Sequence, residues 1–371
     1  MNIQRKIQRA IARIHPNVDR HLWHWRGPWL VAPMVAAVVW GGRSLGALQG
    51  LEWACFDQGM RWRLDEGRDR RVLIVEVTEK DLQRAQQWPL SGQVLAELIN
   101  RIKQGQPAAI GLDIYRDFPV EPGHQALNEV FRTTPNLIGI QKLIANDGGS
   151  AILPPSELAD RDQVGSNDLL LDLDGRLRRS LLYQSVGETT HESFSLRLAD
   201  LYLAHQGIEP DLEAPVLTWR GRSFPPFERN DGGYVGADAS AHQMLLNYRS
   251  GAQPFERVSM GAVLAGQVPK AAFRNRVVMI GTTAASLKDR FLTPLSQSRK
   301  GVSVLMPGIE VHAHGVSQIL GDGAGWAIAT ARLVGGLGVG LGWWLGRGLG
   351  AGADLGAGGE AIWAGWVAGC W

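Results

Sequence analysis

RVVMIGTTAASLKDRFLTPL, residues 276–295, and MPGIEVHAHGVSQIL, residues 306–320, contain the pattern that decides the fold of this 371-residue chain. In the first stretch an apolar run, Val277 to Ile280, ends at Gly281 and is followed by small hydroxyl residues. This pattern is typical of a buried strand whose C-terminal end leads into a polar loop. Ligand sites of open α/β sheets usually form at the carboxyl ends of such strands. The first stretch therefore predicts a central strand with a candidate site beside its end.

The second stretch places three polar side chains at alternate positions, Glu310, His312 and His314. If its backbone is extended, the three point to one face, and if it is helical they spread around the axis. Histidines two residues apart suit a strand and are not a helical metal-binding pair. A helix by the middle of the stretch is favoured by the apolar residues Val311, Val316, Ile319 and Leu320. Both forms stay open for its beginning.

Three earlier apolar runs have the length and composition of strands that are covered on both faces. They lie at 72–77, 108–113 and 136–142. Helices are predicted between them, one from 94 to 104 with Ser91 as N-cap and one from about 125 to 132. This alternation of strands and helices predicts a largely parallel sheet with helices on its faces.

From residue 164 the pattern changes. Asp174-Gly175 is a hairpin turn signal, and the arms of the predicted hairpin are 167–173 and 177–184. Apolar residues at helical spacing predict a core helix from Phe194 to His205. Residues 245–248 and 255–264 are predicted to add a strand and a helix.

The two ends of the chain carry membrane signals. Six basic residues precede an uncharged apolar run from 28 to 42, and they are Arg5, Lys6, Arg9, Arg13, Arg20 and Arg26. The positive-inside rule then places residues 1–27 in the cytoplasm, a transmembrane anchor at 28–56 and the following domain, 57–323, outside. A cleaved signal peptide is the competing interpretation, but the basic region is long and no small-residue cleavage site follows at the right distance. All 14 tryptophans except Trp88 and Trp219 lie before residue 63 or after residue 325, as expected for membrane interfaces.

Residues 324–345 are apolar except for Arg332 and are predicted to return across the membrane. The glycine-rich tail, 346–371, has no clear period. It is interpreted as a truncated or frame-shifted membrane segment, or as the end of a short sensor-only protein. The predicted fold class is therefore α/β, a mostly parallel sheet with flanking helices and an inserted hairpin, between N- and C-terminal transmembrane helices.

Together these motifs resemble one family, the type-two CHASE domain. The matching residues at the C-terminal end are Ile280-Gly281, Asp289, Thr293-Pro294, Pro307-Gly308-Ile309-Glu310 and His312-Ala313. The family also has an aspartate-x-aspartate-glycine motif followed by paired arginines, and the matching residues here are Asp172, Asp174, Gly175, Arg178 and Arg179. The resemblance implies an extracytoplasmic sensory domain, as found in bacterial adenylate cyclases, histidine kinases and serine/threonine kinases. Such sensors usually signal as dimers, and family members continue through membrane helices into a cytoplasmic output domain that this chain is not expected to contain.

The candidate site residues are Asp113, Asp289, Thr293, Glu310 and His312. Acid groups and imidazole that meet at the carboxyl edge of a sheet can bind a metal or transfer protons, but each can equally cap a helix or tie loops together. The sequence has no phosphate-binding loop, nucleophile elbow or EF-hand spacing, so no catalytic residue, metal or cofactor is assigned. Its two cysteines, Cys55 and Cys370, provide no disulfide framework.

The preferred function is a sensor in the bacterial inner membrane that binds a small ligand or a periplasmic protein and signals through its transmembrane helices. We expect a homodimer, with a separate cytoplasmic signalling partner if the chain has no output domain of its own. The net charge of +2, with acidic and basic residues mixed, gives no face for nucleic acid. Two alternatives stay open, an exported enzyme that uses Asp113, Asp289, Glu310 and His312, and an envelope scaffold without a ligand.

Overall fold

The computed structural model describes residues 31, 33–144, 151–219, 221–296, 298–299 and 302–321. The chain divides into two compact units. One comprises Met1–Phe56, Arg229–Ala237 and Ile328–Trp371, and the other comprises Asp57–Glu228 and Asp238–Ala327. The division falls inside helix α2, Gln49–Trp62.

In the first unit, residues 33–44 are helical and a turn at 45–48 precedes α2. Arg43 pairs with Glu52 at 2.9 Å and donates to the carbonyl of Gly232, while the Trp53 ring packs on Tyr234. Within the described ranges, no helix has both the length and the apolarity that crossing a membrane requires. The anchor at 28–56 therefore stays a prediction. The regions predicted at 1–27, 324–345 and 346–371 lie outside the described residues.

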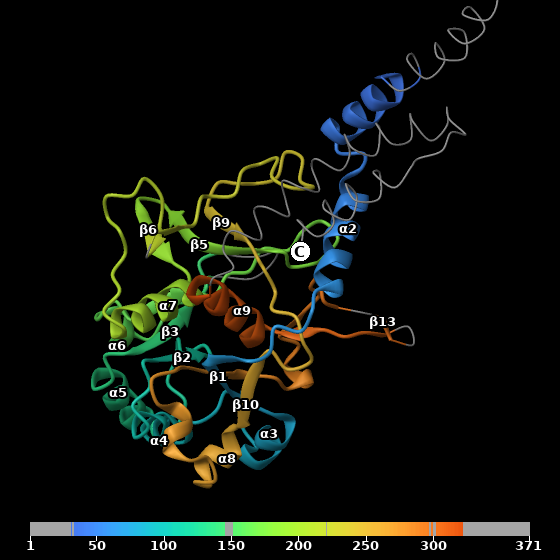
Figure 1. The fold of residues 1–371 in the computed structure, drawn as a ribbon. Coiled ribbons are helices and arrows are strands. Elements are labelled where there is room, and N and C mark those ends of the chain that lie inside the picture. The colour runs from blue at the N-terminus through green and yellow to red at the C-terminus, as the bar shows by residue number, and fades with distance from the viewer. Residues whose placement is uncertain are drawn as a thin grey trace, which may run out of the picture. The chain divides into compact units, whose positions relative to one another are not determined.

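The second unit is built on a parallel six-stranded sheet, as the alternation of apolar runs predicted (Figure 1). Its strands, in spatial order, are β10 (Phe255–Ser259), β1 (Asp69–Val77), β11 (Val277–Thr282), β2 (Ala109–Asp113), β3 (Leu137–Gln141) and β4 (Val164–Ser166). Every neighbouring pair is parallel. Strand β11, the centre of the deciding stretch, lies between β1 and β2 and is buried along its whole length. The expectation of a buried central strand at 277–280 is confirmed.

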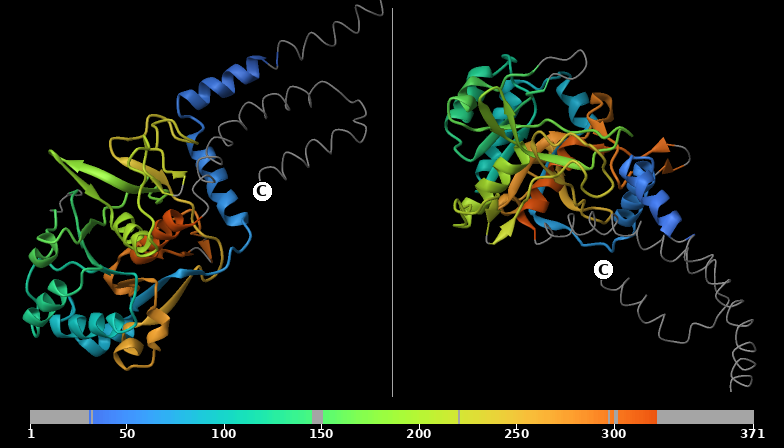
Figure 2. Two further views of the ribbon diagram at one scale, coloured as in Figure 1. Left: turned by 60° about the vertical axis from the view of Figure 1, so that its left-hand side comes forward. Right: turned by 90° about the horizontal axis from the view of Figure 1, so that it is seen from above.

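Helices cover both faces of this sheet (Figure 2). On one face lie α3 (Glu79–Ala85), α4 (Gly92–Lys103), α5 (His124–Arg132) and α8 (Met260–Leu264), and on the other lie α7 (Phe194–His205) and α9 (Gly308–Leu320). Alternate side chains of each strand enter the two resulting cores, so that Ile74 packs with α7 and α9 while Leu73 and Val75 pack with α4 and α5. Burial on both faces explains why the strand sequences are continuously apolar.

Local sequence signals set the beginnings of these helices. The hydroxyl of Thr78 accepts from the backbone N–H of Asp81, whose carboxylate accepts from Thr78 in return, which is a capping box. Ser91 accepts from the N–H of Val94, as predicted, and Ser193 and Ser259 cap α7 and α8 in the same way.

In the second stretch Met306–Pro307 form the short strand β15, and the segment that carries Glu310, His312 and His314 is helical throughout, because α9 begins at Gly308. The extended form of that segment is therefore wrong. All 13 residues of α9 are buried. The helix approaches β11 so closely that a Cβ on Gly281 would lie 2.7 Å from the Cβ of Ile309. Glycine at this position is what allows the helix to lie on the strand.

Two predicted elements are corrected. Residues 255–259 form the edge strand β10, and only 260–264 are helical, because the apolar residues of the segment pack against β1. The predicted hairpin has its turn at Asp174-Gly175, but its first arm contributes only an isolated bridge, Leu170 to Arg179. Strand β5 (Arg179–Val186) instead pairs with β6 (Thr189–Glu192) and with β9 (His242–Leu245), which ends where a strand at 245–248 was predicted to begin.

The remaining described elements are short. They are α6 (Ser156–Ala159), β7 (Thr218–Trp219), β8 (Arg222–Ser223), η1 (Lys270–Phe273), η2 (Ala285–Leu287), β12 (Arg290–Phe291), β13 (Ser298–Arg299), β14 (Val302–Ser303) and β15 (Met306–Pro307). Strand β12 pairs with β15 and so joins the loop after β11 to the beginning of α9.

Candidate functional site

Two aspartates lie at the carboxyl edge of the central strands, and we call them the acidic pair. Asp113 ends β2 and is in register with Gly281 of the neighbouring strand β11, while Asp289 lies in the loop that follows β11. Both are partly buried, and neither forms an ion pair with any lysine or arginine among the described residues. The pKa of each is raised to about 6, by burial for Asp113 and by burial together with the negative charge of Asp113 for Asp289.

Two polar side chains surround Asp113. The hydroxyl of Tyr115 donates to Oδ1 of Asn167 at 2.8 Å, and Nδ2 of Asn167 lies 3.5 Å from Oδ1 of Asp113. Burial raises the pKa of Tyr115 to about 12, and the nearby aspartates add to the effect. Tyr115 therefore stays protonated and acts as a hydrogen-bond donor beside the acidic pair.

His312 lies within electrostatic reach of Asp289, on the second turn of α9. Burial lowers its pKa to about 4, although Asp289 opposes that shift, so the imidazole is neutral at pH 7. Its backbone carbonyl accepts from the hydroxyl of Ser195, and its ring meets Phe194 edge-on. His312 is thus held in the core by α7, and the charges of Asp289 and Asp168 act on its ring.

The other two predicted site residues lie apart from the acidic pair. Glu310 pairs with Arg257 of β10 at 2.6 Å. The carbonyl of Thr293 accepts from Arg176 at 2.6 Å, and its N–H donates to the hydroxyl of Ser296. In the described part of the chain, no three His, Cys, Asp or Glu side chains are grouped closely enough to hold a metal ion. The convergence of Asp113, Asp289, Glu310 and His312 that the sequence suggested is therefore reduced to Asp113, Asp289 and His312.

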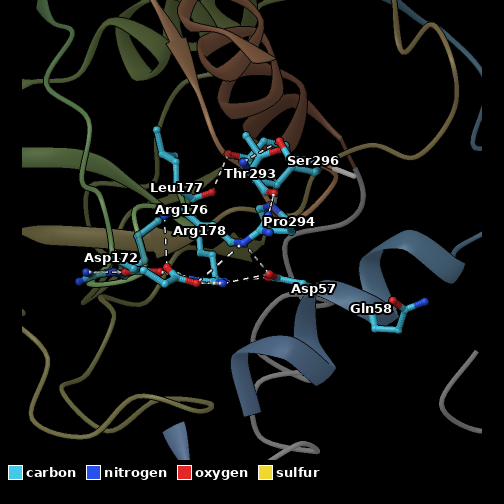
Figure 3. Close-up of polar contacts among 12 residues, drawn as sticks. Asp57, Gln58, Asp172, Arg176, Leu177, Arg178, Thr293, Pro294 and Ser296 are labelled. Atoms are coloured by element: carbon cyan, nitrogen blue, oxygen red, sulfur yellow. Dashed lines mark hydrogen bonds and ion pairs between the residues drawn. The ribbon is translucent and has the colours of Figure 1, made fainter. Parts of the chain in front are cut away.

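A second cluster of charges is buried more deeply, and we call it the arginine network (Asp57, Asp172, Asp174, Arg178 and Arg179). Its centre is Arg178, whose side chain is only 1% exposed. Its guanidinium makes five hydrogen bonds of 2.6 to 2.9 Å, two to Asp57, one to Asp172 and two to Asp174 (Figure 3). Every N–H that an arginine possesses is thereby used.

Within the network, Arg178 and Asp174 each favour the charged form of the other. Burial alone would lower the pKa of Arg178, but hydrogen bonds to Asp174, Asp57 and Asp172 raise it above its ordinary value. For Asp174, burial acts to raise the pKa, yet the hydrogen bond from Arg178 brings it below the usual range. Arg179 adds two bonds to the other oxygen of Asp172, at 2.9 and 3.1 Å.

A glycine sets the geometry of the segment that carries these charges. Gly175 has a φ of 74°, and its N–H donates to the carbonyl of Asp172 at 2.8 Å. This left-handed conformation favours glycine, and the tight turn brings Asp172 and Asp174 onto the same side as Arg178. The aspartate-glycine signal in the sequence is thus required by the network as well as by the turn.

The network joins three segments that are distant in sequence. Asp57 and Arg61 belong to α2, and Arg61 donates to the carbonyl of Pro294 at 2.8 Å. Leu177, next to Arg178, donates its N–H to the carbonyl of Leu292 at 2.8 Å, and Arg176 reaches Asp57 at 3.4 Å. Figure 3 shows these contacts around Thr293 and Pro294. Helix α2, the 172–179 segment and the loop at 292–296 are therefore held by one set of polar contacts.

Sequence reasoning found four aspartate and arginine members of this network but missed Asp57. It was missed because it follows directly after the predicted anchor and its partner is 121 residues away. The signal that could have found it is an acidic residue one position beyond a membrane-like segment, since such a charge needs a partner when it is buried.

A family model described as the CHASE2 domain matches residues 34–349 of the chain. That range contains the acidic pair and the whole arginine network. No curated protein matches the chain, and no solved structure matches it.

Proposed function

The chain belongs to the CHASE2 domain family, extracytoplasmic sensory domains of signalling proteins, and we propose that it is the membrane-anchored input module of a bacterial receptor. In this proposal the α/β domain lies outside the cell membrane and binds a ligand or a periplasmic protein. Binding changes the equilibrium between two arrangements of the helices that enter the membrane.

The observation that carries the proposal is the arginine network. The predicted anchor ends at residue 56, and Asp57, the next residue of the same helix α2, is bound by Arg178 through two hydrogen bonds. A displacement of the 172–179 segment or of the loop at 292–296 would therefore act on the helix that continues the anchor. A ligand shifts such an equilibrium only by its difference in affinity for the two states.

The loop after β11 connects the acidic pair with the network. Asp289 lies four residues before Thr293, whose carbonyl accepts from Arg176. Between them, β12 is paired with β15 at the beginning of α9, which makes the loop a braced connection. We propose that a change at the sheet edge, such as a bound ligand or a change in the charge of Asp289, reaches α2 through this loop.

The test uses Cys55, which is exposed on α2 two residues before Asp57. In the full chain in membranes, with Cys370→Ser so that only Cys55 reacts, the rate of disulfide cross-linking between two copies reports how the α2 helices of a homodimer approach. We expect Asp57→Asn to change that rate several-fold, because the bond that fixes the helix to the domain is weakened. Glu97→Gln, which removes an exposed pair with Arg101, is the matched control and should leave the rate unchanged.

Equal rates in the wild type and in Asp57→Asn would contradict the proposed coupling. A second measurement addresses the topology. Alkaline phosphatase, which is active only outside the cytoplasm, should be active when fused after residue 321 and inactive when fused after residue 27. The opposite result would overturn the extracytoplasmic placement of the domain.

A further inference from the structure

A cavity of about 880 Å³ lies at the carboxyl ends of three neighbouring strands and shares no lining residue with the acidic pair or the arginine network. Thr78 follows β1, Ser259 ends β10 and Thr283 follows β11, and all three line the cavity. Open α/β sheets bind ligands outside the carboxyl ends of their strands.

The two carboxylates of the cavity already have hydrogen-bond donors from the protein. Asp81 accepts from the N–H and the hydroxyl of Thr78, at 3.0 and 2.7 Å, and from the N–H of Gly261 at 3.0 Å. Glu79 accepts from the N–H and the hydroxyl of Ser286, at 2.7 and 3.0 Å. The N–H of Ser286 is the main cause that lowers the pKa of Glu79. These acids are used to fasten α3 to α8 and to the loop after β11.

The two cations of the cavity have no such partners. Lys80 and Arg84 are exposed, and neither side chain forms an ion pair or a hydrogen bond with any other described residue. Arg84 lies over the backbone of Gly261, since a Cβ on that glycine would lie 2.8 Å from its Nη1 atom. The hydroxyl of Ser259 and the amide of Gln267 add neutral donors to the lining.

We infer that this cavity binds a small anionic solute through a carboxylate or phosphate group. The planar guanidinium of Arg84 matches the two oxygens of either group, and the ammonium of Lys80 supplies a second positive charge. The volume is within the range of cavities that enclose small organic ligands, so the solute is larger than a single inorganic ion.

This inference rests on the proposed sensor function, because it identifies the solute as the input signal. Thr283 lines the cavity, its carbonyl accepts from Arg290 at 2.6 Å, and Glu79 holds Ser286 of the same loop. An anion at Arg84 and Lys80 would therefore act on the loop that continues through Asp289 to Thr293.

The test measures the thermal midpoint, Tm, of the full chain in a neutral detergent with and without added anion. Citrate and inorganic phosphate are the probes, and sodium chloride at the same ionic strength is the salt control. At about 10 mM citrate or phosphate we expect a rise in Tm of at least about 2 °C beyond the salt control. The double variant Lys80→Gln/Arg84→Gln should lose this rise.

Two further variants separate binding from folding. Arg132→Gln/Lys270→Gln removes the same number of positive charges from exposed positions outside the cavity and should keep the rise. Ala265→Glu retains both cations but places a carboxylate at an exposed position of the cavity lining, so it should abolish the rise.

The inference is overturned if neither probe raises Tm beyond the salt control, or if the double variant responds like the wild type. A separate arm replaces the free anions with short-chain phosphatidylglycerol micelles. A rise in that arm alone would overturn a free solute in favour of a lipid headgroup. The rate of Cys55 cross-linking is measured in the same samples. If citrate raises Tm through Arg84 and Lys80 but leaves that rate unchanged, the cavity binds the anion and the proposed coupling fails instead.

Discussion

The arginine network and the acidic pair both contain aspartates that are shielded from water, but only the aspartates of the network are paired with a cation. In the network, Asp57, Asp172 and Asp174 share the five N–H groups of Arg178. In the acidic pair, Asp113 and Asp289 have no cationic partner among the described residues, and burial raises the pKa of each to about 6. A cationic partner stabilises the charged form of a buried carboxylate. Without one, burial raises the pKa, and the carboxylate is protonated more readily.

The difference indicates different roles. A fully paired network holds its three segments in one geometry. An unpaired acidic pair changes its charge when its surroundings change, and it lies at the edge of the sheet next to the loop that leads to the network. The network is thus suited to transmit a displacement. The acidic pair is suited to change its charge when its surroundings change.

The largest expected effect comes from breaking the network at its centre. Arg178→Met keeps most of the side-chain volume but removes the central cation from the buried carboxylates of Asp57 and Asp172, which then keep only their contacts with Arg176 and Arg179. We expect the free energy of unfolding to fall by about 3–5 kcal/mol. Denaturant unfolding of the full chain in detergent would measure this loss. Arg101→Met is the matched control, because Arg101 pairs with Glu97 on the surface and should cost no more than about 1 kcal/mol. Similar losses for the two variants would refute a structural role of the network.

The second prediction removes one charge of the acidic pair, and its sign depends on pH. The folded pKa of Asp113, about 6, lies above the ordinary value of 3.8, so the folded state binds this proton more tightly than the unfolded state. Stability from this group is present below pH 3.8 and is lost as pH rises toward 6. Asp113→Asn avoids that loss. At pH 8 the variant should be more stable than the wild type by about 1–3 kcal/mol, with little difference at pH 4.

Unfolding free energies of both proteins between pH 4 and pH 8 would test this prediction. Burial lowers the pKa of His312 to about 4 and of His314 to about 3, so their contribution is present above pH 6.5 and is lost on acidification. That contribution is common to both proteins and cancels in their difference. Asp117→Asn, at an exposed position four residues away, serves as the control and should show no pH-dependent gain. A constant difference across the pH range would mean that Asp113 is not the titrating group.

A smaller effect is expected from crowding Asp289. A Cβ on Gly308 would lie 2.6 Å from Oδ2 of Asp289, so Gly308→Ala forces the carboxylate to move. Because an aspartate side chain can rotate, we expect a loss of only about 1–2 kcal/mol in the free energy of unfolding. Gly59→Ala in α2 meets no atom within 4 Å and should instead stabilise the helix by up to about 1 kcal/mol. If both alanines stabilise the protein, Asp289 does not occupy the position next to α9.

The smallest effect is expected at Glu310, which the sequence motif marked as a site candidate. Glu310 itself is buried, but its partner Arg257 is partly exposed and glutamine keeps the side-chain volume, so Glu310→Gln should cost about 0.5–1 kcal/mol in the free energy of unfolding. Glu256→Gln, which breaks the comparable pair with Arg276, should cost about the same. The rate of Cys55 cross-linking should be unaffected by either change. A several-fold change in that rate for Glu310→Gln alone would mean that Glu310 does take part in signalling.

Much of the fold could be predicted from local pattern. The apolar runs at 72–77, 108–113 and 277–280 are strands because only a position buried on both faces suits such a run, and helices between them make the sheet parallel. The edge strand β10 was mistaken for a helix. Its two apolar residues, Phe255 and Val258, are three positions apart, a spacing that also suits a helix, and five residues are too few to show a strand period.

The candidate site was less predictable. Loop residues that follow adjacent parallel strands were expected to meet, and Asp289 does lie within electrostatic reach of Asp113 and of His312. Glu310 and Thr293 do not, because α9 is helical from Gly308 and turns Glu310 toward Arg257. The cavity at Lys80 and Arg84 was not found at all, since neither residue belongs to a motif and their lack of partners is visible only in three dimensions.

The sequence by itself determined the buried strands, the helix cap at Ser91, the glycine turn at Gly175 and the family to which the chain belongs. Those features depend on residues that are close together in the sequence, so their periodicity and backbone preferences can be recognised without the structure. Only the tertiary structure decided which charges are paired. Arg178 takes its partners from 4, 6 and 121 residues away, and burial, which sets the charge of Asp113 and Asp289, results from the packing of the whole sheet.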